Sequence, residues 1–208
     1  MRIISSLAAV AAICLFSTAA EAAGPLQVKV GAAGVLPDES ASISTIGGSV
    51  NISNEWAPSI QLEYFLDDHV SAELLCCIAR HDVVAVGTSL GAVPLGKVSH
   101  FPPTVTLKYR WTDFGRFEPY VGAGVNYTHF FDAKLPAGAV TSIDYKDSFG
   151  GALQAGADVR LNDRWFVNVD VRKIWISSDV SLKAGATAIK ANVDINPIVV
   201  ATGVGVRF

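Results

Sequence analysis

Apolar and polar residues alternate along most of this chain. In residues 104–111, for example, Val105, Leu107 and Tyr109 fall on one face, and Thr106 and Lys108 fall on the other. Strict alternation is typical of a half-buried β-strand, because successive strand side chains point to opposite faces, whereas a helix would scatter both sets. Further strands with this pattern are predicted at 26–33, 58–66, 70–78, 119–131, 149–160, 165–172 and 195–208.

The connections between these eight predicted strands alternate in length. Tight turns are predicted at 67–69, 112–117 and 161–164, and long polar, mobile loops at 35–56, 80–101, 132–147 and 177–194. Short turns at one end and long loops at the other are typical of an outer-membrane barrel. The pattern therefore predicts an all-β fold, an eight-stranded antiparallel up-and-down transmembrane β-barrel with both termini on the short-turn side.

The composition favours a membrane setting. Of 208 residues, 50% are hydrophobic and only 17% are charged, against about 25% charged in a typical soluble domain. Beyond the N-terminus, no apolar run approaches the ~20 residues that a membrane helix needs. A closed barrel can cross without such runs, because its strands satisfy every backbone polar group. The net charge of −3 and the lack of a basic tract argue against nucleic acid as a partner.

The N-terminus is predicted to be a cleaved secretory signal peptide over residues 1–22, which leaves 23–208 as the barrel domain. Arg2 provides the positive start, residues 3–16 the apolar core, and Ala20-Glu21-Ala22 the small-x-small cleavage site. An uncleaved anchor helix is the alternative, but the apolar core is short for one. Cys14 follows Ile13, where a lipoprotein signal requires a small residue, so lipidation is not expected.

The apolar faces are expected to meet lipid, and the polar faces the barrel lumen. A soluble barrel with an apolar core is the alternative, because alternation alone does not distinguish inside from outside. The polar faces carry six bases and four acids, enough for salt-bridged packing within a lumen, at Lys29, Glu63, Glu73, Lys108, Arg110, Asp158, Arg160, Asp170, Arg172 and Arg207. A selectivity filter is the other interpretation of these charges, and it requires an open pore.

Few residues suggest chemistry. Cys76 and Cys77 are neighbours on a predicted strand, where their side chains point to opposite faces, and we interpret both as small hydrophobic residues. A lipid-modifying enzyme would need a histidine beside a nucleophile. No nucleophile is identified near the four histidines, which we interpret as solvated loop residues: His69, His81, His100 and His129. No enzymatic activity, cofactor or metal site is therefore expected.

Several segments resemble a known family. They are His100-Phe101-Pro102-Pro103-Thr104, the stretch 118–127 with Phe130-Phe131-Asp132, the stretch 146–150, and the terminal 205–208. Together they resemble the OmpW family of small outer-membrane proteins. The resemblance implies an eight-stranded barrel in the outer membrane of Gram-negative bacteria and a narrow apolar channel for small hydrophobic molecules. It also implies that Leu75 corresponds to a leucine that narrows the channel, and that the family's closing aromatic falls near Arg172.

The sequence is therefore compatible with two functions. The first is a narrow channel for passive passage of small hydrophobic molecules. Its candidate lining residues are Leu75, Glu73, Lys108, Arg110, Asp170 and Arg172, and its mouth motif is His100, Phe101, Pro102 and Pro103. The second is a structural or receptor barrel whose outer loops bind phage, bacteriocins or host surfaces.

Two further expectations concern the ends of strands and the partners. Pro102 and Pro103 donate no backbone hydrogen bond, so they are expected to set where the strand at 104 begins. The alternative interpretation is functional: a lateral opening at this point would let an apolar solute leave the barrel into the bilayer. Phe208, the last residue, is predicted to be a membrane-insertion signal. The expected partners are the lipid bilayer of the outer membrane, small hydrophobic solutes and the outer-membrane assembly machinery.

Overall fold

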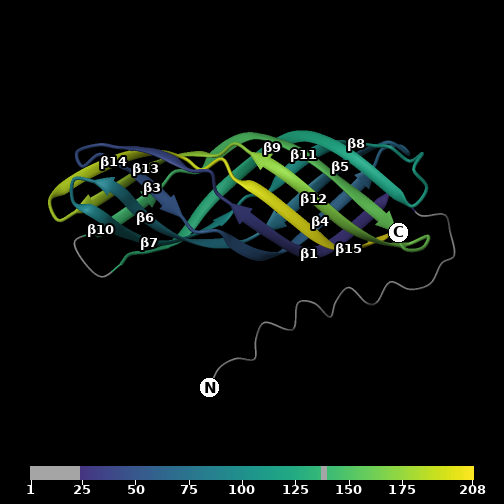
Figure 1. The fold of residues 1–208 in the computed structure, drawn as a ribbon, viewed down its shortest axis with the longest axis horizontal. Helices are drawn as coiled ribbons and strands as arrows, with labels where there is room; N and C mark the ends of the chain where they lie inside the picture. Colours follow the sequence, from purple (N-terminus) through teal and green to yellow (C-terminus); the bar gives the residue numbers. More distant parts are fainter. Residues whose placement is uncertain (1–23, 137–139) are drawn as a thin grey trace, which may run out of the picture.

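Eight antiparallel strands close into a barrel in the computed structural model, which describes residues 24–136 and 140–208 (Figure 1). These strands are β1 (Leu26–Leu36), β4 (Glu55–Phe65), β5 (Val70–Cys77), β8 (Thr104–Arg110), β9 (Phe117–Lys134), β11 (Ser148–Arg160), β12 (Trp165–Ile174) and β15 (Ile198–Arg207). Each pairs with the next in this order, and β15 returns to β1. The predicted fold class is confirmed. The predicted signal peptide at 1–22, with Cys14, lies outside the described residues.

Tight turns join the strands at one end of the barrel, as expected. They connect β4 to β5, β8 to β9 and β11 to β12. The ends of β1 and β15 lie at the same end of the molecule, where the backbone N–H of Phe208 donates to the carbonyl of Leu26 at 2.8 Å. No helix in the described part of the chain is long and apolar enough to cross a membrane.

The prediction of long mobile loops is wrong, because most of the described residues in those ranges form strands. These are β2 (Ser40–Ile43), β3 (Ser49–Ile52), β6 (Ala79–Thr88), β7 (Gly91–Phe101), β10 (Val140–Tyr145), β13 (Ser177–Ala184) and β14 (Thr187–Asp194). We call this set the extension. Strands β7, β6 and β3 continue the barrel sheet beyond β9, and β10, β13, β14 and β2 form a second sheet. In Figure 1 the extension prolongs the barrel along its axis.

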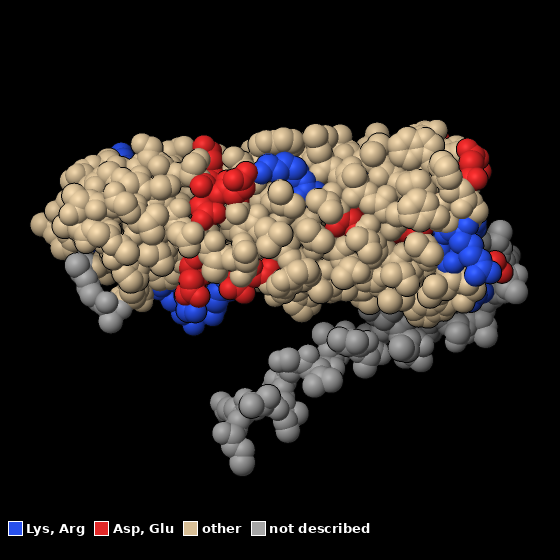
Figure 2. Space-filling view, in the orientation of Figure 1, with Lys and Arg blue, Asp and Glu red and all other residues tan. Residues whose placement is uncertain are grey.

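The two faces of the barrel strands have the predicted orientation. On β8, Val105 and Leu107 are 49% and 57% exposed, whereas Thr106 and Lys108 are 0% and 1% exposed. Aromatic residues stand on the outer surface near both ends of the apolar belt, including Tyr109, Trp111 and Trp165 at the turn end and Trp56, Phe149 and Trp175 at the other. In Figure 2, charged side chains are scarce over the barrel and gather near its two ends.

The polarity of the two faces exchanges where the barrel meets the extension. Along β12 the buried face carries Asp170 and Arg172, and it continues with buried Ile174 and Ile176 and with Val180 and Leu182 on β13. The outer face changes in the opposite sense, from Val169 and Val171 to Ser177, Asp179, Ser181 and Lys183. The barrel therefore has a polar interior and an apolar exterior, whereas the extension has an apolar interior and a polar exterior.

Candidate functional site

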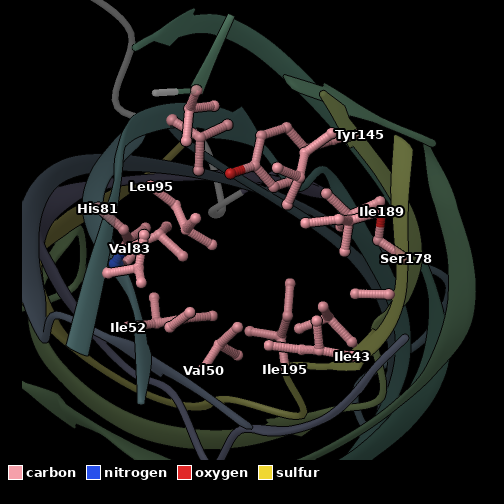
Figure 3. A pocket seen from close by; sticks show the side chains of 18 of the residues that line it. Ile43, Val50, Ile52, His81, Val83, Leu95, Tyr145, Ser178, Ile189 and Ile195 are labelled. Atoms are coloured by element: carbon pink, nitrogen blue, oxygen red, sulfur yellow. The ribbon is translucent and has the colours of Figure 1, made fainter. Parts of the chain in front are cut away.

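An apolar cavity of about 120 Å³ lies inside the extension. Aliphatic side chains from both sheets point into it, among them Ile43, Val50, Val83, Leu95 and Ile189 (Figure 3). The cavity is not fully enclosed, and its lining extends to Leu90, which is 72% exposed at the outer surface. Sequence analysis named His100, which lines this cavity, as a mouth residue, but missed the cavity itself because its strands were taken for loops. The inward alternation of Val180 with Leu182, and of Ile189 with Val193, was the available signal.

Two histidines meet at the wall of this cavity. His81 on β6 and His100 on β7 are 4% and 5% exposed, and their Nε2 atoms lie 3.1 Å apart. Both residues line the cavity. The interpretation of these two as solvated loop residues is therefore wrong. Sequence spacing could not show the contact, which depends on the β6–β7 register, where Ala79 pairs with His100 and His81 with Val98.

The surroundings keep both imidazoles neutral. Burial lowers the pKa of His81, and burial together with the neighbouring His81 ring lowers the pKa of His100 to about 3. The Nδ1 atom of His81 lies 2.6 Å from the carbonyl oxygen of Ser53, so the proton of this neutral ring is on Nδ1. Its Nε2 then presents a lone pair toward His100.

An aromatic row continues from this pair along the cavity wall. The His100 ring stacks on Phe130 with ring centroids 6.2 Å apart, and Phe130 stacks on Tyr145 at 5.7 Å. Burial raises the pKa of the Tyr145 hydroxyl, which has no hydrogen-bond partner among the described residues. Figure 3 shows this hydroxyl pointing toward the interior. Ser178, also at the lining, donates its hydroxyl hydrogen to the carbonyl of Lys146 at 2.6 Å.

The other two histidines lie outside the cavity lining. The Nδ1 atom of His69 is 3.0 Å from the carbonyl oxygen of Arg110 at the turn end. His129 is exposed on β9, with its Nδ1 atom 2.9 Å from an oxygen of Asp147. Among the described residues, no group of three or more His, Cys, Asp or Glu residues is arranged to hold a metal ion.

Between the cavity and the tight-turn end of the molecule, a layer of small and aliphatic side chains fills the barrel interior next to the cavity. It includes Ala33, Val35, Leu75, Ile174 and Ile176, all of them 0–1% exposed. Val35 belongs to this layer and also lines the cavity, so the two are continuous. The structure thus places Leu75 inside the barrel, between the cavity and the charged residues beneath.

A closed network of charges fills the lumen below this layer. Glu73 is central to it, with its carboxylate oxygens 2.5 Å from Lys29 Nζ, 2.9 Å from Lys108 Nζ and 2.5 Å from Arg172 Nη2. Arg110 pairs with Glu63 at 3.0 Å and with Asp158 at 2.7 Å. We call the eight charged residues that are 0–1% exposed the plug: Lys29, Glu63, Glu73, Lys108, Arg110, Asp158, Asp170 and Arg172.

The plug is balanced and densely bonded. Its four cations face four anions, and Tyr120 lies among them with its ring centroid 3.6 Å from Lys108 Nζ. Gln154 donates from Nε2 to Glu73 at 2.9 Å, and Arg172 donates to Asp170 at 3.0 Å. Five of the six candidate lining residues therefore come together in one salt-bridged network, and Leu75 lies above them. Salt-bridged packing is the interpretation that this geometry favours over a filter in an open pore.

The mouth motif marks a break in the hydrogen-bond ladder of the barrel wall. Strand β5 pairs with β8 up to Leu75 and Thr104, and the ladder resumes between β6 and β7 at Ala79 and His100. Between these pairs the register places 76–78 opposite 101–103, where Pro102 and Pro103 have no N–H to donate. Asn126 on β9 holds the prolines by donating from Nδ2 to the carbonyls of Pro102 at 3.1 Å and Pro103 at 3.2 Å.

The remaining predicted residues lie at the wall and at the chain end. Phe101 ends β7 and is partly buried. Cys76 is partly exposed, and Cys77 is buried with its side chain toward the lumen; both are free thiols. Phe208 is 41% exposed beside β1, and its role in membrane insertion stays a prediction.

A closed barrel with an apolar belt, aromatic residues at both belt edges and a polar, filled lumen defines a small outer-membrane β-barrel protein. The model of the OmpW family matches residues 22–208, and the chain belongs to that family. An uncharacterized outer-membrane protein, y4mB of Sinorhizobium fredii, is 37% identical over 88% of this chain and 80% of the relative. The dibenzothiophene metabolism operon protein PahQ of Pseudomonas aeruginosa is 30% identical over 94% of each chain.

Among solved structures, the crystal structure of the outer membrane protein OprG from Pseudomonas aeruginosa matches with a TM-score of 0.83 and 29% identity. The match covers 90% of this chain and 97% of that one. The protein is thus an outer-membrane barrel, and the resemblance noted in the sequence is confirmed.

Proposed function

We propose that this protein gives small apolar molecules a passive route from the cell exterior into the outer membrane. The observation that carries the proposal is an apolar cavity whose lining extends to the outer surface and which ends above a sealed, charged lumen. Burial of apolar surface is favoured by about 25 cal/mol per Å². An ion entering the same space would lose its hydration without finding partners, so the cavity selects apolar solutes.

The plug decides where a solute leaves. An apolar molecule that moved further along the barrel axis would have to separate ion pairs whose members are fully buried. The break between 76–78 and 101–103 lies beside the apolar layer that contains Leu75, well before the plug. In our proposal the solute passes through this break into the bilayer, and Leu75 lines the floor of the route. The name of the PahQ relative, which refers to an apolar aromatic compound, supports a cargo of this class.

Uptake in reconstituted vesicles tests the route. Vesicles with a lipopolysaccharide outer leaflet, with and without the protein, are offered toluene and an ionic solute such as benzoate. We expect the protein to accelerate uptake of toluene and not of benzoate. Toluene uptake equal to that of protein-free vesicles would refute the proposal.

A matched pair of variants locates the route in the cavity. Ala85 is 1% exposed and lines the cavity, whereas the next residue, Val84, points to the other face of β6. Ala85→Trp should fill the cavity and slow toluene uptake, and Val84→Trp should leave uptake unchanged. Equal uptake through both variants, in barrels shown to be folded, would place the route elsewhere.

A reversible cross-link tests the lateral exit. The register places Pro102 opposite Cys77, and both side chains are buried. Opposed strand residues have Cα atoms about 4.5–5.5 Å apart, which a disulfide can bridge. In a Cys76→Ser background, Pro102→Cys should form this disulfide on oxidation, slow toluene uptake, and recover with reductant. Pro102→Ser is the control, and unchanged uptake with a verified cross-link would exclude this exit.

A further inference from the structure

The cavity wall contains a chain of hydrogen bonds from the carbonyl of Ser53 through His81 to His100, which we call the relay. The passage of purely apolar molecules does not need it. The two histidines and Tyr145 interrupt a lining that is otherwise almost wholly apolar. Burying polar groups costs free energy unless they are hydrogen-bonded, so groups of this kind in an apolar pocket usually fix the orientation of a ligand.

The direction of the relay follows from its contacts. Because His81 donates from Nδ1 to the carbonyl of Ser53, its Nε2 is an acceptor. The facing Nε2 of His100, 3.1 Å away, must therefore be the donor. A neutral imidazole carries one proton, so Nδ1 of His100 has a free lone pair. This atom has no hydrogen-bond partner among the described residues. The relay thus ends in an acceptor on a residue of the cavity wall.

Two facing imidazoles also suggest a metal ion, but a metal site needs further ligands beside this pair. A structural zinc site uses four protein ligands and a catalytic site three. Within the described chain, no third His, Cys, Asp or Glu joins this pair. Proton placement on Nδ1 of His81 and on Nε2 of His100 accounts for both short contacts without a metal.

We propose that the cavity binds apolar molecules carrying one hydroxyl or N–H group, such as phenols and short alcohols, and that this group donates to Nδ1 of His100. This deepens the proposed function, on which it rests, by naming a cargo class. The flat face of an aromatic cargo would lie along the row formed by His100, Phe130 and Tyr145. The cavity volume of about 120 Å³ suits one such ring, since an engineered apolar cavity of about 150 Å³ in another protein binds benzene.

The test uses probes of nearly the same size that differ in hydrogen bonding. Toluene has no polar group, phenol can donate, and anisole can only accept. Binding to the reconstituted full chain is measured by competition, and each affinity is corrected for partition into protein-free vesicles. In the unmodified protein, phenol should bind about threefold to tenfold more tightly than either other probe, which is the range expected for one hydrogen bond.

The double variant His81→Leu with His100→Phe should abolish this preference and leave toluene binding in place, because phenylalanine retains the stacking on Phe130. His100→Phe alone would leave the Nε2 acceptor of His81 without its donor. The matched control is His129→Phe, which changes an exposed histidine of the same region and should retain the preference. Imidazole ¹⁵N spectra give a second readout, in which phenol should shift Nδ1 of His100 and toluene should not.

Three outcomes would overturn the inference. They are a phenol preference that survives the double variant His81→Leu with His100→Phe, one that is lost only in Tyr145→Phe, and equal binding of phenol and anisole. Uptake of toluene in the vesicle experiment separates the two proposals. If toluene enters but phenol is not preferred, the inference fails alone, whereas if toluene does not enter, the proposed route fails.

Discussion

Neutralising Glu73 should destabilise the barrel severely. The carboxylate is within 2.9 Å of three cations, Lys29, Lys108 and Arg172, and its side chain is fully buried. In Glu73→Gln, an amide NH₂ or a neutral oxygen would replace the charged oxygens. The plug would then hold four cations against three anions, all of them buried away from the outer surface.

The magnitude follows from burial. Removing one partner of a buried ion pair costs about 3–5 kcal/mol, which lowers the folding equilibrium constant by roughly two to nearly four orders of magnitude. The matched control is Asp179→Asn. Asp179 pairs with Lys146 at 3.5 Å, but their side chains are 60% and 72% exposed. Because an exposed pair contributes about 0–1 kcal/mol, this variant should unfold close to the unmodified protein.

The assay is reversible urea unfolding in lipid vesicles, followed by the fluorescence of the tryptophans. A shift in midpoint at constant slope reports a change in stability. The double variant Glu73→Gln with Arg172→Met returns the plug to three cations and three anions. It should lose less stability than the sum of the two single changes. If Glu73→Gln unfolds at the same urea concentration as Asp179→Asn, the plug is a hydrated lumen and the barrel axis is not sealed.

Three other predictions concern the belt, the strand spacing and the extension. Val169→Lys, at a site 53% exposed on the belt, should cost about 2–4 kcal/mol near the bilayer midplane in the same urea assay, whereas Ser181→Lys on the outer face of the extension should cost little. A Cβ on Gly124 would lie 1.9 Å from the carbonyl oxygen of Val105, so Gly124→Val should reduce the folded fraction on gels, and the outward-facing Ala123→Val should not. Because burial lowers the pKa of His100 from 6.5 to about 3, the unfolded chain binds the proton first as pH falls. The extension should therefore lose stability progressively between pH 6.5 and 3, and hydrogen exchange in β7 should show less of this loss in His100→Phe.

The barrel was predictable because lipid imposes a strong alternation. On β8 and β12 an apolar residue must stand outside at every second position, and ionic residues stand inside. Glu73, Lys108 and Arg172 could therefore be assigned to one lumen from sequence alone. Their mutual pairing could not, because it depends on the stagger between strands that are distant in the chain, such as β5 and β12.

The cavity was not predictable by the same means. Its strands carry shorter apolar patterns, such as Val180 and Leu182 on β13, within segments rich in Gly, Ser and Ala. The histidine pair requires the β6–β7 hairpin register, which sets His81 diagonally across from His100. Had the segment 79–88 been recognised as a strand, Ala79, His81, Val83 and Ala85 would have appeared on one face.

The exchange of polarity between the faces connects the fold to the proposed route. Outward residues follow the solvent, which is lipid around Val169 and water around Asp179. Inward residues change in the opposite sense, from Arg172 to Ile174, at nearly the same level. The apolar interior therefore begins about where the bilayer ends, and the proline break at 101–103 lies at this junction. A solute in the cavity and the acyl chains outside are then separated only by a wall that lacks part of its backbone ladder, which is the geometry that the lateral route requires.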